Sequence, residues 1–186
     1  MIDSLRLKIR ALVGDISSSD FETFTYTSSD IFTIAQENIT IASVLINGAE
    51  LGSGDYSFDS TTNKITVTAS GFGAGDVLEV DYTYYSYSDS ELLEYIRAAL
   101  VWLSIFSYCE DDFELETTYI YPTPTNITVD LIAIIASIII KPNYSEYNLP
   151  NLKVKYPRNI SKDEKIRRII QSFQQGIGII SVLEFD

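Results

Sequence analysis

Carboxylate side chains are the groups in this chain whose number and spacing could support catalysis, because the sequence holds 26 Asp and Glu. The densest group lies at residues 110–116, where the sequence reads EDDFELE. A pair of carboxylates can hydrolyse a glycosidic bond, with one group as the acid and the other as the base or nucleophile. The same stretch alternates with apolar residues, which is typical of an edge strand with a solvated face. We therefore favour a structural interpretation and keep a hydrolase that uses Asp111 and Glu114 as the alternative.

Histidine is absent from the sequence, and Cys109 is its single cysteine. The lack of histidine removes the usual base of a catalytic triad and the commonest zinc ligand. One cysteine cannot form an internal disulfide. As a nucleophile, Cys109 would stand beside carboxylates, which raise the pKa of a thiol rather than lower it. We expect this thiol to be buried or incidental, and we predict a protein that is not an enzyme and has no catalytic residue, no metal and no cofactor.

Residues 45–59, with the sequence LINGAELGSGDYSFD, concentrate glycine and aspartate as a phosphate or metal loop would. A phosphate-binding loop needs a lysine after its last glycine, and a dinucleotide fingerprint needs a helix to follow. Here the last glycine is followed by Asp55 and by residues typical of a strand. A weak calcium site at Asp55 and Asp59 stays an alternative, although the closing glutamate of an EF-hand is missing. We interpret the stretch as turns, with Asn47-Gly48 in a tight hairpin.

Basic side chains concentrate toward the C-terminal end of a chain whose formal net charge is −13 and whose pI is near 4.3. They are Lys153, Lys155, Arg158, Lys162, Lys165, Arg167 and Arg168. Nucleic-acid binding needs such residues to neutralise phosphates, but Asp163 and Glu164 dilute the group. Ion pairs with another subunit or with a partner protein are therefore the favoured interpretation.

Charge and hydrophobic periodicity divide the chain into two domains. Residues 21–86 hold one basic residue against nine acidic ones, and their apolar residues alternate with period two. Such alternation, with β-branched and aromatic residues, predicts strands at 43–46, 56–58, 64–68 and 77–84. Helical periodicity governs the rest of the chain. We therefore predict a helical domain from residues 1–20 and 87–186, with an antiparallel β-sandwich or barrel inserted at 21–86.

Apolar stripes and capping residues mark the helices. Apolar residues recur every three or four positions from Ile2 to Val13, and Gly14 is suited to end that helix. The basic residues Arg6, Lys8 and Arg10 lie mostly off this stripe; we favour a solvated face for them and keep contact with an acidic neighbour as the alternative. Capping boxes at 88–91 and 161–164 begin two further helices. Helices are thus expected at 2–13, 92–108, 127–140 and from 161 to about 175, followed by a strand or extended arm at 179–186.

Residues 131–140, LIAIIASIII, form the most apolar run of the chain. This run is shorter than the roughly 20 residues that a bilayer span needs. The first ten residues also lack the apolar segment of a signal peptide. We expect a soluble protein that is made in the cytoplasm and has no membrane partner.

The segment LRLKIR at 5–10, before Gly14-Asp15, and the capped segment DSELLEYIRAA at 89–99 belong to two of the expected helices. With short helices and an extended tail after them, the arrangement resembles the head–tail connector proteins of tailed bacteriophages, also called adaptor or head-completion proteins. The resemblance implies an α+β fold: a small helical connector-type bundle with the β domain inserted and an extended C-terminal arm. It also implies a virion structural protein in the neck of the particle. There a homo-oligomeric ring, usually of twelve copies, links portal to tail and helps to retain packaged DNA.

The partners that the resemblance implies are other copies of the chain, the portal protein, and tail or further connector proteins. DNA would pass through the ring without specific binding. In such proteins the C-terminal arm docks on the portal. The implied interface with the portal or a neighbouring subunit comprises Ile177, Ile179, Ile180, Val182, Leu183 and Phe185, together with Lys162, Arg167 and Arg168. The alternative hypothesis is a binding protein of the phage particle, whose β domain grips carbohydrate or a capsid or tail surface.

Overall fold

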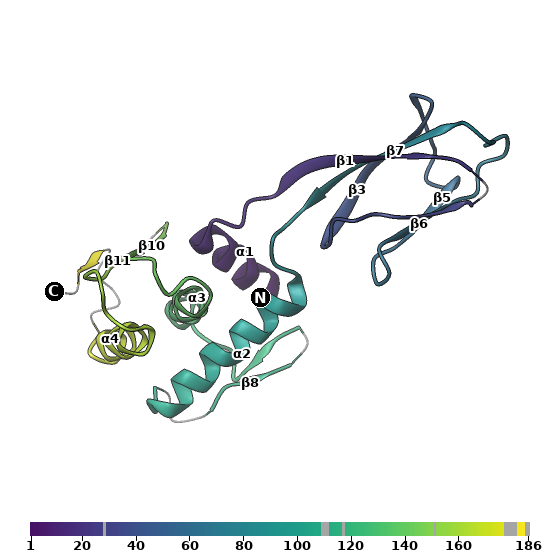
Figure 1. The fold of residues 1–186 in the computed structure, drawn as a ribbon. Coiled ribbons are helices and arrows are strands. Elements are labelled where there is room, and N and C mark those ends of the chain that lie inside the picture. The colour runs from purple at the N-terminus through teal and green to yellow at the C-terminus, as the bar shows by residue number, and fades with distance from the viewer. Residues whose placement is uncertain (28, 109–111, 117, 151, 177–181, 185–186) are drawn as a thin grey trace. The chain divides into compact units, whose positions relative to one another are not determined.

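The computed structural model contains residues 1–186 and describes all of them except 28, 109–111, 117, 151, 177–181 and 185–186. The chain divides into two compact units, which we describe separately (Figure 1). Met1–Asp15 and Ser88–Asp186 form the first, called here the mixed unit. Ile16–Tyr87 form the second, called the β unit. The predicted boundary after residue 20 falls inside a strand, because β1 spans Ser18–Thr25.

Two antiparallel sheets make up the β unit. The larger has the strand order β1-β7-β3-β4, with β7 at Val77–Tyr84, β3 at Ile39–Ile46 and β4 at Ala49–Glu50. The smaller has the order β2-β6-β5, with β2 at Ile31–Thr33, β6 at Lys64–Val67 and β5 at Tyr56–Asp59. The sequence pattern predicts β3, β5, β6 and β7, but it does not predict β1, β2 or β4.

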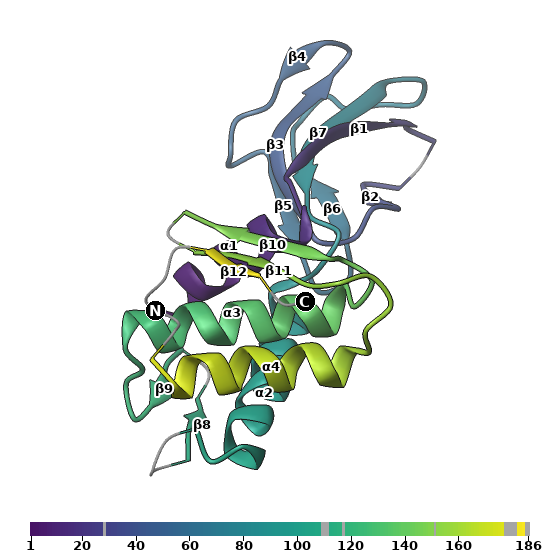
Figure 2. The ribbon, with the colours of Figure 1, turned by 90° about the vertical axis from the view of Figure 1, so that its left-hand side faces the viewer.

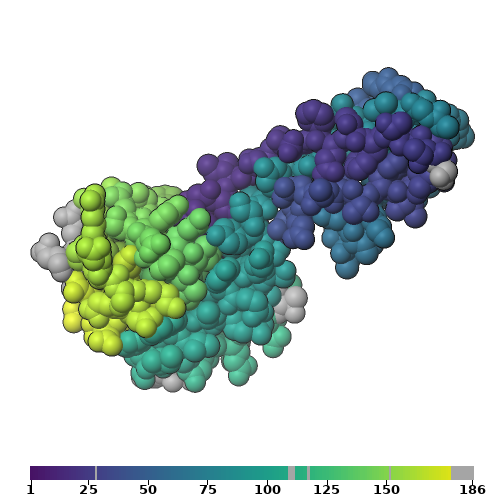
Figure 3. Space-filling view, viewed as in Figure 1, coloured from purple at the N-terminus to yellow at the C-terminus, as the bar shows by residue number. Residues whose placement is uncertain are grey.

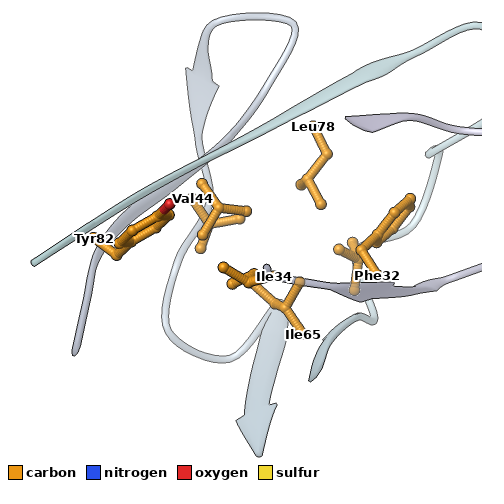
Figure 4. Packing of buried hydrophobic residues seen from close by; sticks show 8 residues of the cluster. Phe32, Ile34, Val44, Ile65, Leu78 and Tyr82 are labelled. Carbon is orange, nitrogen blue, oxygen red and sulfur yellow. The ribbon is translucent and has the colours of Figure 1, made fainter. Parts of the chain in front are cut away.

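Side chains from both sheets meet in one apolar core (Figure 4). Phe32 and Ile65 come from the smaller sheet, and Val44, Leu78 and Tyr82 come from the larger one. Along β7 the alternate residues Leu78, Val80 and Tyr82 are buried, because successive side chains of a strand point to opposite faces. Removing each such side chain from water contributes about 1.5–3 kcal/mol, which makes this core the main stabilising feature of the unit.

The glycine-rich stretch between β3 and β5 consists of turns. Asn47 and Gly48 connect β3 to β4 with φ of 50° and 81°. Positive φ at both positions is what a type I′ hairpin turn requires, so this prediction is confirmed. The two aspartates that could have bound calcium close turns of their own. Asp55 accepts from Gly52 N at 3.2 Å, and Asp59 accepts from Thr61 N at 2.9 Å.

In its described part, the mixed unit contains the helices α1 (Ile2–Val13), α2 (Asp89–Ile105), α3 (Asn126–Ile140) and α4 (Lys162–Gln174). Residues 128, 129 and 131–138 of α3 are buried, because α1, α2 and α4 all pack against this helix (Figure 2). The apolar run at 131–140 therefore serves as the core of this unit. Within the described residues, no helix has both the length and the apolar character that a membrane span requires.

Capping residues begin these helices as the sequence predicts for α2 and α4. Ser88 Oγ accepts from Glu91 N at 3.1 Å, while Ser88 N donates to Glu91 Oε2 at 2.6 Å, which completes a capping box. Two hydrogen bonds thus satisfy backbone donors that a helix start leaves without partners. The C-terminal end of α1 is capped by Gly14, as the sequence predicts. Gly14 has a φ of 71°, and its N–H donates to the Arg10 carbonyl.

Short sheets also belong to the mixed unit. One pairs β8 (Glu114–Leu115) with β9 (Ile120–Tyr121), and the other has the order β10-β11-β12. In the second sheet β10 (Glu146–Leu149) is antiparallel to β11 (Leu152–Lys155), and β12 (Val182–Glu184) runs parallel to β11. The described residues form a mixed structure, with four helices and four small sheets that are mostly antiparallel.

The predicted connector-type bundle with an extended C-terminal arm is therefore wrong. The helices of the mixed unit are not a bundle, because α1 to α4 share their unit with two sheets. The described part of the predicted arm is a sheet strand, since Val182, Leu183 and Glu184 pair with Lys153, Val154 and Lys155. Parallel pairing over such a sequence separation leaves no local signal in a single sequence, and strands of four residues leave little periodicity.

Candidate interaction surfaces

The basic residues of α1 form ion pairs inside the mixed unit, so their interpretation as a solvated face is wrong. Lys8 pairs with Asp130 of α3. Arg10 pairs with Asp15 and, through Nη2 at 2.9 Å, with Asp89 Oδ1 at the start of α2. The side chains of Arg10 and Asp15 are almost completely buried. The segment that carries the connector resemblance thus fastens α1 to α2 and α3.

The second half of α2 exposes apolar side chains, although the opposite side of the helix is buried in the mixed unit. Val101 and Ile105, one helical turn apart, are 53% and 64% exposed. Half-exposed Trp102 and Phe106 stack beside them, with ring centroids 6.0 Å apart and an interplanar angle of 14°. We call these four residues the α2 apolar face. Contiguous apolar surface of this kind marks interaction sites more often than isolated exposed residues do.

An open hollow of about 300 Å³ lies on the larger sheet of the β unit. Its lining residues are Ser19, Asp20, Phe21, Ala42, Asp81, Tyr82 and Thr83. Phe21 on β1 stands opposite Asp81 on β7 and is 57% exposed. The register of β3 against β7 shifts between Ile41 and Ser43, and a bulge of this kind redirects side chains beside it. Ser43 Oγ donates to Asp81 Oδ2 at 2.5 Å, which orients the carboxylate in the hollow.

Tyr82 connects this hollow to the interior of the β unit. Its hydroxyl donates to Glu22 Oε1 at 3.1 Å, and the same oxygen accepts from Ala35 N at 2.9 Å. Burial, and then the hydrogen bond to the Glu22 carboxylate, raise the pKa of Tyr82 to about 12. Both effects favour the neutral phenol, since ionisation would place a second negative charge beside Glu22. The hydrogen bonds of Glu22 join β1 to the loop after β2.

A second hollow, of about 350 Å³, belongs to the mixed unit. Its lining residues are Pro142, Asn143, Ser145, Pro157, Arg158, Asn159, Ile160 and Lys165. The segment from α3 to α4 that supplies them, coloured from green to yellow, forms one continuous region of the surface in Figure 3. Two cationic side chains, Arg158 and Lys165, line this hollow, and no carboxylate is among its described lining residues.

The predicted interface residues are only partly within the described chain. Ile177, Ile179, Ile180 and Phe185 lie outside the described residues. The backbone of Val182 and Leu183 forms β12. The three basic residues lie on α4 and have partners there: Arg168 Nε is 2.9 Å and Arg167 Nη1 is 3.7 Å from Glu164, and Lys162 Nζ is 4.0 Å from Asp163.

The predicted acidic cluster is likewise described in part. Cys109, Glu110 and Asp111 lie outside the described residues, and Glu114 begins β8. In the part of the chain that the structure describes, no group of three or more acidic or cysteine side chains is placed to hold a metal ion. The pair of Asp111 and Glu114 therefore stays a hypothesis from the sequence.

Sequence reasoning missed both hollows as sites. Lys165 carried a signal, because it stands four residues before Ile169 and eight before Phe173 and so shares their buried face of α4. Phe21 carried none, because it stands before the first strand that the pattern predicts. No family model matches the chain, and the search of curated proteins found none that is similar to it.

Proposed function

We propose that this chain is a structural subunit of a tailed-phage virion, which assembles with copies of itself and with the portal at the head–tail junction. The observation that carries the proposal is the α2 apolar face. One side of α2 contributes to the core of the mixed unit, and the opposite side presents Val101, Trp102, Ile105 and Phe106. A second copy or a neighbouring virion protein would remove this surface from water.

The size of the apolar side chains gives an estimate of the free energy that association would gain. Complete burial of one Val, Ile or Phe side chain contributes about 1.5–3 kcal/mol, so partial burial of four such groups supplies several kcal/mol of association energy. Stacked aromatic residues at the centre of an interface are typical of its strongest contacts. The resemblance of residues 5–10 and 89–99 to connector helices supplies the kind of particle and the neighbour, the portal.

Introducing negative charge on the α2 apolar face tests the proposal. The double variant Val101→Glu/Ile105→Glu is expected to remain folded, because both side chains are exposed, and to lose self-association and portal binding. Leu7→Glu is the matched control, since Leu7 is an equally exposed apolar residue on α1 of the same unit. Sedimentation velocity measures the assembly, and circular dichroism checks the fold. A double variant that assembles as well as the Leu7→Glu control would contradict the proposal.

A second candidate function is supported by the hollow of the β unit. An exposed aromatic ring beside carboxylate and hydroxyl groups suits a sugar, whose apolar face packs on the ring while its hydroxyls form hydrogen bonds. Phe21, Asp81 and Thr83 offer these groups. A glycan array probed with the full chain tests this candidate. Retention that Phe21→Ala abolishes and Ile31→Ala preserves would favour it over the assembly proposal, and an array without any signal would reject it.

A further inference from the structure

Lys165 is a buried cation whose partners are backbone carbonyls. Only 3% of the residue is exposed. Its Nζ donates to the carbonyl oxygens of Pro142, at 2.5 Å, and Tyr144, at 2.7 Å, and lies 5.8 Å from the ring centroid of Tyr156. No ion pair joins this ammonium to any carboxylate among the described residues. Buried charges in proteins are as a rule paired, so the arrangement leaves the charge with incomplete compensation.

An ammonium group has three N–H donors, and two of those of Lys165 are used by the two carbonyls. Lys165 also lines the hollow of about 350 Å³ described above. Arg158 lines the same hollow and is exposed, and no ion pair of Arg158 with a described residue is present. Asn143, Ser145 and Asn159 add neutral hydrogen-bonding groups. The hollow thus combines two cations with three polar neutral side chains.

The walls of the hollow are held by hydrogen bonds of the surrounding chain. Tyr147 is buried, and its hydroxyl donates to the Lys141 carbonyl at 2.7 Å, which ties β10 to the end of α3. The Tyr156 hydroxyl donates to the Lys165 carbonyl at 3.1 Å, and Tyr156 N donates to the Ser145 carbonyl at 2.8 Å. The loops on both sides of the hollow are therefore fastened to each other and to α4 before any ligand arrives.

We propose that this hollow is an oxyanion-binding site, in which Lys165 and Arg158 bind a phosphate or carboxylate group. The third N–H of Lys165 would donate to one oxygen of the anion. The planar guanidinium of Arg158 can donate two parallel N–H groups to two oxygens. Asn143, Ser145 and Asn159 supply further donors around the rim. The anion would supply the negative charge that the buried ammonium lacks.

The desolvation of Lys165 supports this assignment. Burial lowers the pKa of Lys165 below its ordinary value of 10.5, because it disfavours the charged form. A bound anion acts in the opposite direction, since a negative charge beside the ammonium stabilises its protonated state. The site does not rest on the proposed assembly function, because none of its lining residues belongs to the α2 apolar face.

Anion titration of the full chain tests the site. Isothermal titration calorimetry would measure binding of inorganic phosphate and, in a separate arm, of acetate, with NaCl keeping the ionic strength constant. We expect saturable binding in at least one arm. Binding of phosphate alone would identify a phosphoryl group as the ligand, and binding of acetate alone would identify a carboxylate. Binding of both would show that the site accepts either oxyanion. No saturable binding in either arm would overturn the proposal.

Three variants locate the binding. Arg158→Ala is expected to raise the Kd for the bound anion at least tenfold, and Lys165→Met is expected to abolish binding. Arg97→Ala is the control, because Arg97 is an exposed arginine on α2 that does not line the hollow. If Lys165→Met fails to fold, Arg158→Ala decides alone, since Arg158 is exposed and its truncation leaves the fold intact. An unchanged Kd in Arg158→Ala would overturn the assignment.

Discussion

Asn47, in the turn between β3 and β4, is hydrogen-bonded to Asp76, which stands directly before β7. Asn47 Nδ2 donates to Asp76 Oδ1 at 2.8 Å. Asn47 Oδ1 also accepts from Val77 N at 2.9 Å, and Asn47 N donates to the Val77 carbonyl at 2.9 Å. A residue that the sequence marks only as a turn former therefore also joins two loops of the β unit that are far apart along the chain.

Asn47→Ala is expected to destabilise the β unit by about 1–2 kcal/mol, because an alanine at positive φ is strained and both side-chain bonds are lost. Asn47→Gly keeps the turn conformation without strain and loses only the bonds, so its effect should be smaller. Urea unfolding of both variants measures the difference. Equal losses of stability in the two variants would contradict the role of φ at this position.

The same contact predicts a pH dependence. Hydrogen bonds from Asn47 Nδ2 and then from Gly73 N hold the pKa of the Asp76 carboxyl below its ordinary value of 3.8. Because the pKa of Asp76 is lower in the folded state than in the unfolded state, its contribution to stability is fully present at pH values above the unfolded-state pKa. The contribution is lost as pH falls through the folded-state pKa. Wild type should therefore lose stability below about pH 4, and Asn47→Ala should lose less over the same range. Parallel curves for the two proteins down to pH 3 would refute this link.

Asp15 and Asp89 both pair with Arg10, but with different burial. The Asp15 side chain is completely buried, whereas that of Asp89 is 65% exposed. Asp15→Ala leaves a buried guanidinium without its main partner and should cost about 3–5 kcal/mol of stability. Asp89→Ala removes an exposed partner and should cost under about 1 kcal/mol. Thermal and urea unfolding of both variants would show the contrast, and similar effects would contradict the burial argument.

Alkaline unfolding should involve Tyr82. Burial and the hydrogen bond to Glu22 raise the pKa of Tyr82 to about 12, from an ordinary value of 10.0. Because the pKa of Tyr82 is higher in the folded state than in the unfolded state, its contribution to stability is fully present at pH values below the unfolded-state pKa. The contribution is lost as pH rises from 10 toward 12, where the unfolded chain loses the phenolic proton more readily than the folded chain does. Tyr82→Phe should show a shallower loss of stability over that range. Glu22→Gln should lower the pKa of Tyr82, which ring NMR shifts report, and an unchanged pKa would count against the contact.

Local signals in the sequence predicted the parts of the fold that local interactions form. The capping box at Ser88 and the turn at Asn47 are confirmed, and so is the start of a helix after Ser161, because each is decided by residues within three positions. At Ser161 only one half of the predicted capping box is present, since the Ser161 side chain accepts from Glu164 N while the Glu164 carboxylate pairs with Arg168. The ion pairs of Arg10 with Asp89 and of Lys8 with Asp130 were not predicted, since their partners are far apart in the sequence. The charges were visible, but their mutual placement depends on how α1, α2 and α3 pack.

The sheet formed by β10, β11 and β12 likewise could not be predicted from local sequence signals. Leu149, Leu152 and Val154 are buried, but strands of four residues contain too few alternations to distinguish a strand from a loop. β12 pairs in parallel with a strand that precedes α4, and such a crossover has no turn signal. Lys165 was counted among the surface cations, although its spacing from Ile169 places it on the buried face of α4.

We propose above that the chain assembles with copies of itself and with the portal. Sedimentation velocity of the purified chain, alone over a concentration series and mixed with portal rings, tests this claim most directly. We expect species that are multiples of the 20.9 kDa subunit, together with co-sedimentation with the portal. A single 20.9 kDa species at every concentration, with no co-sedimentation with the portal, would contradict it.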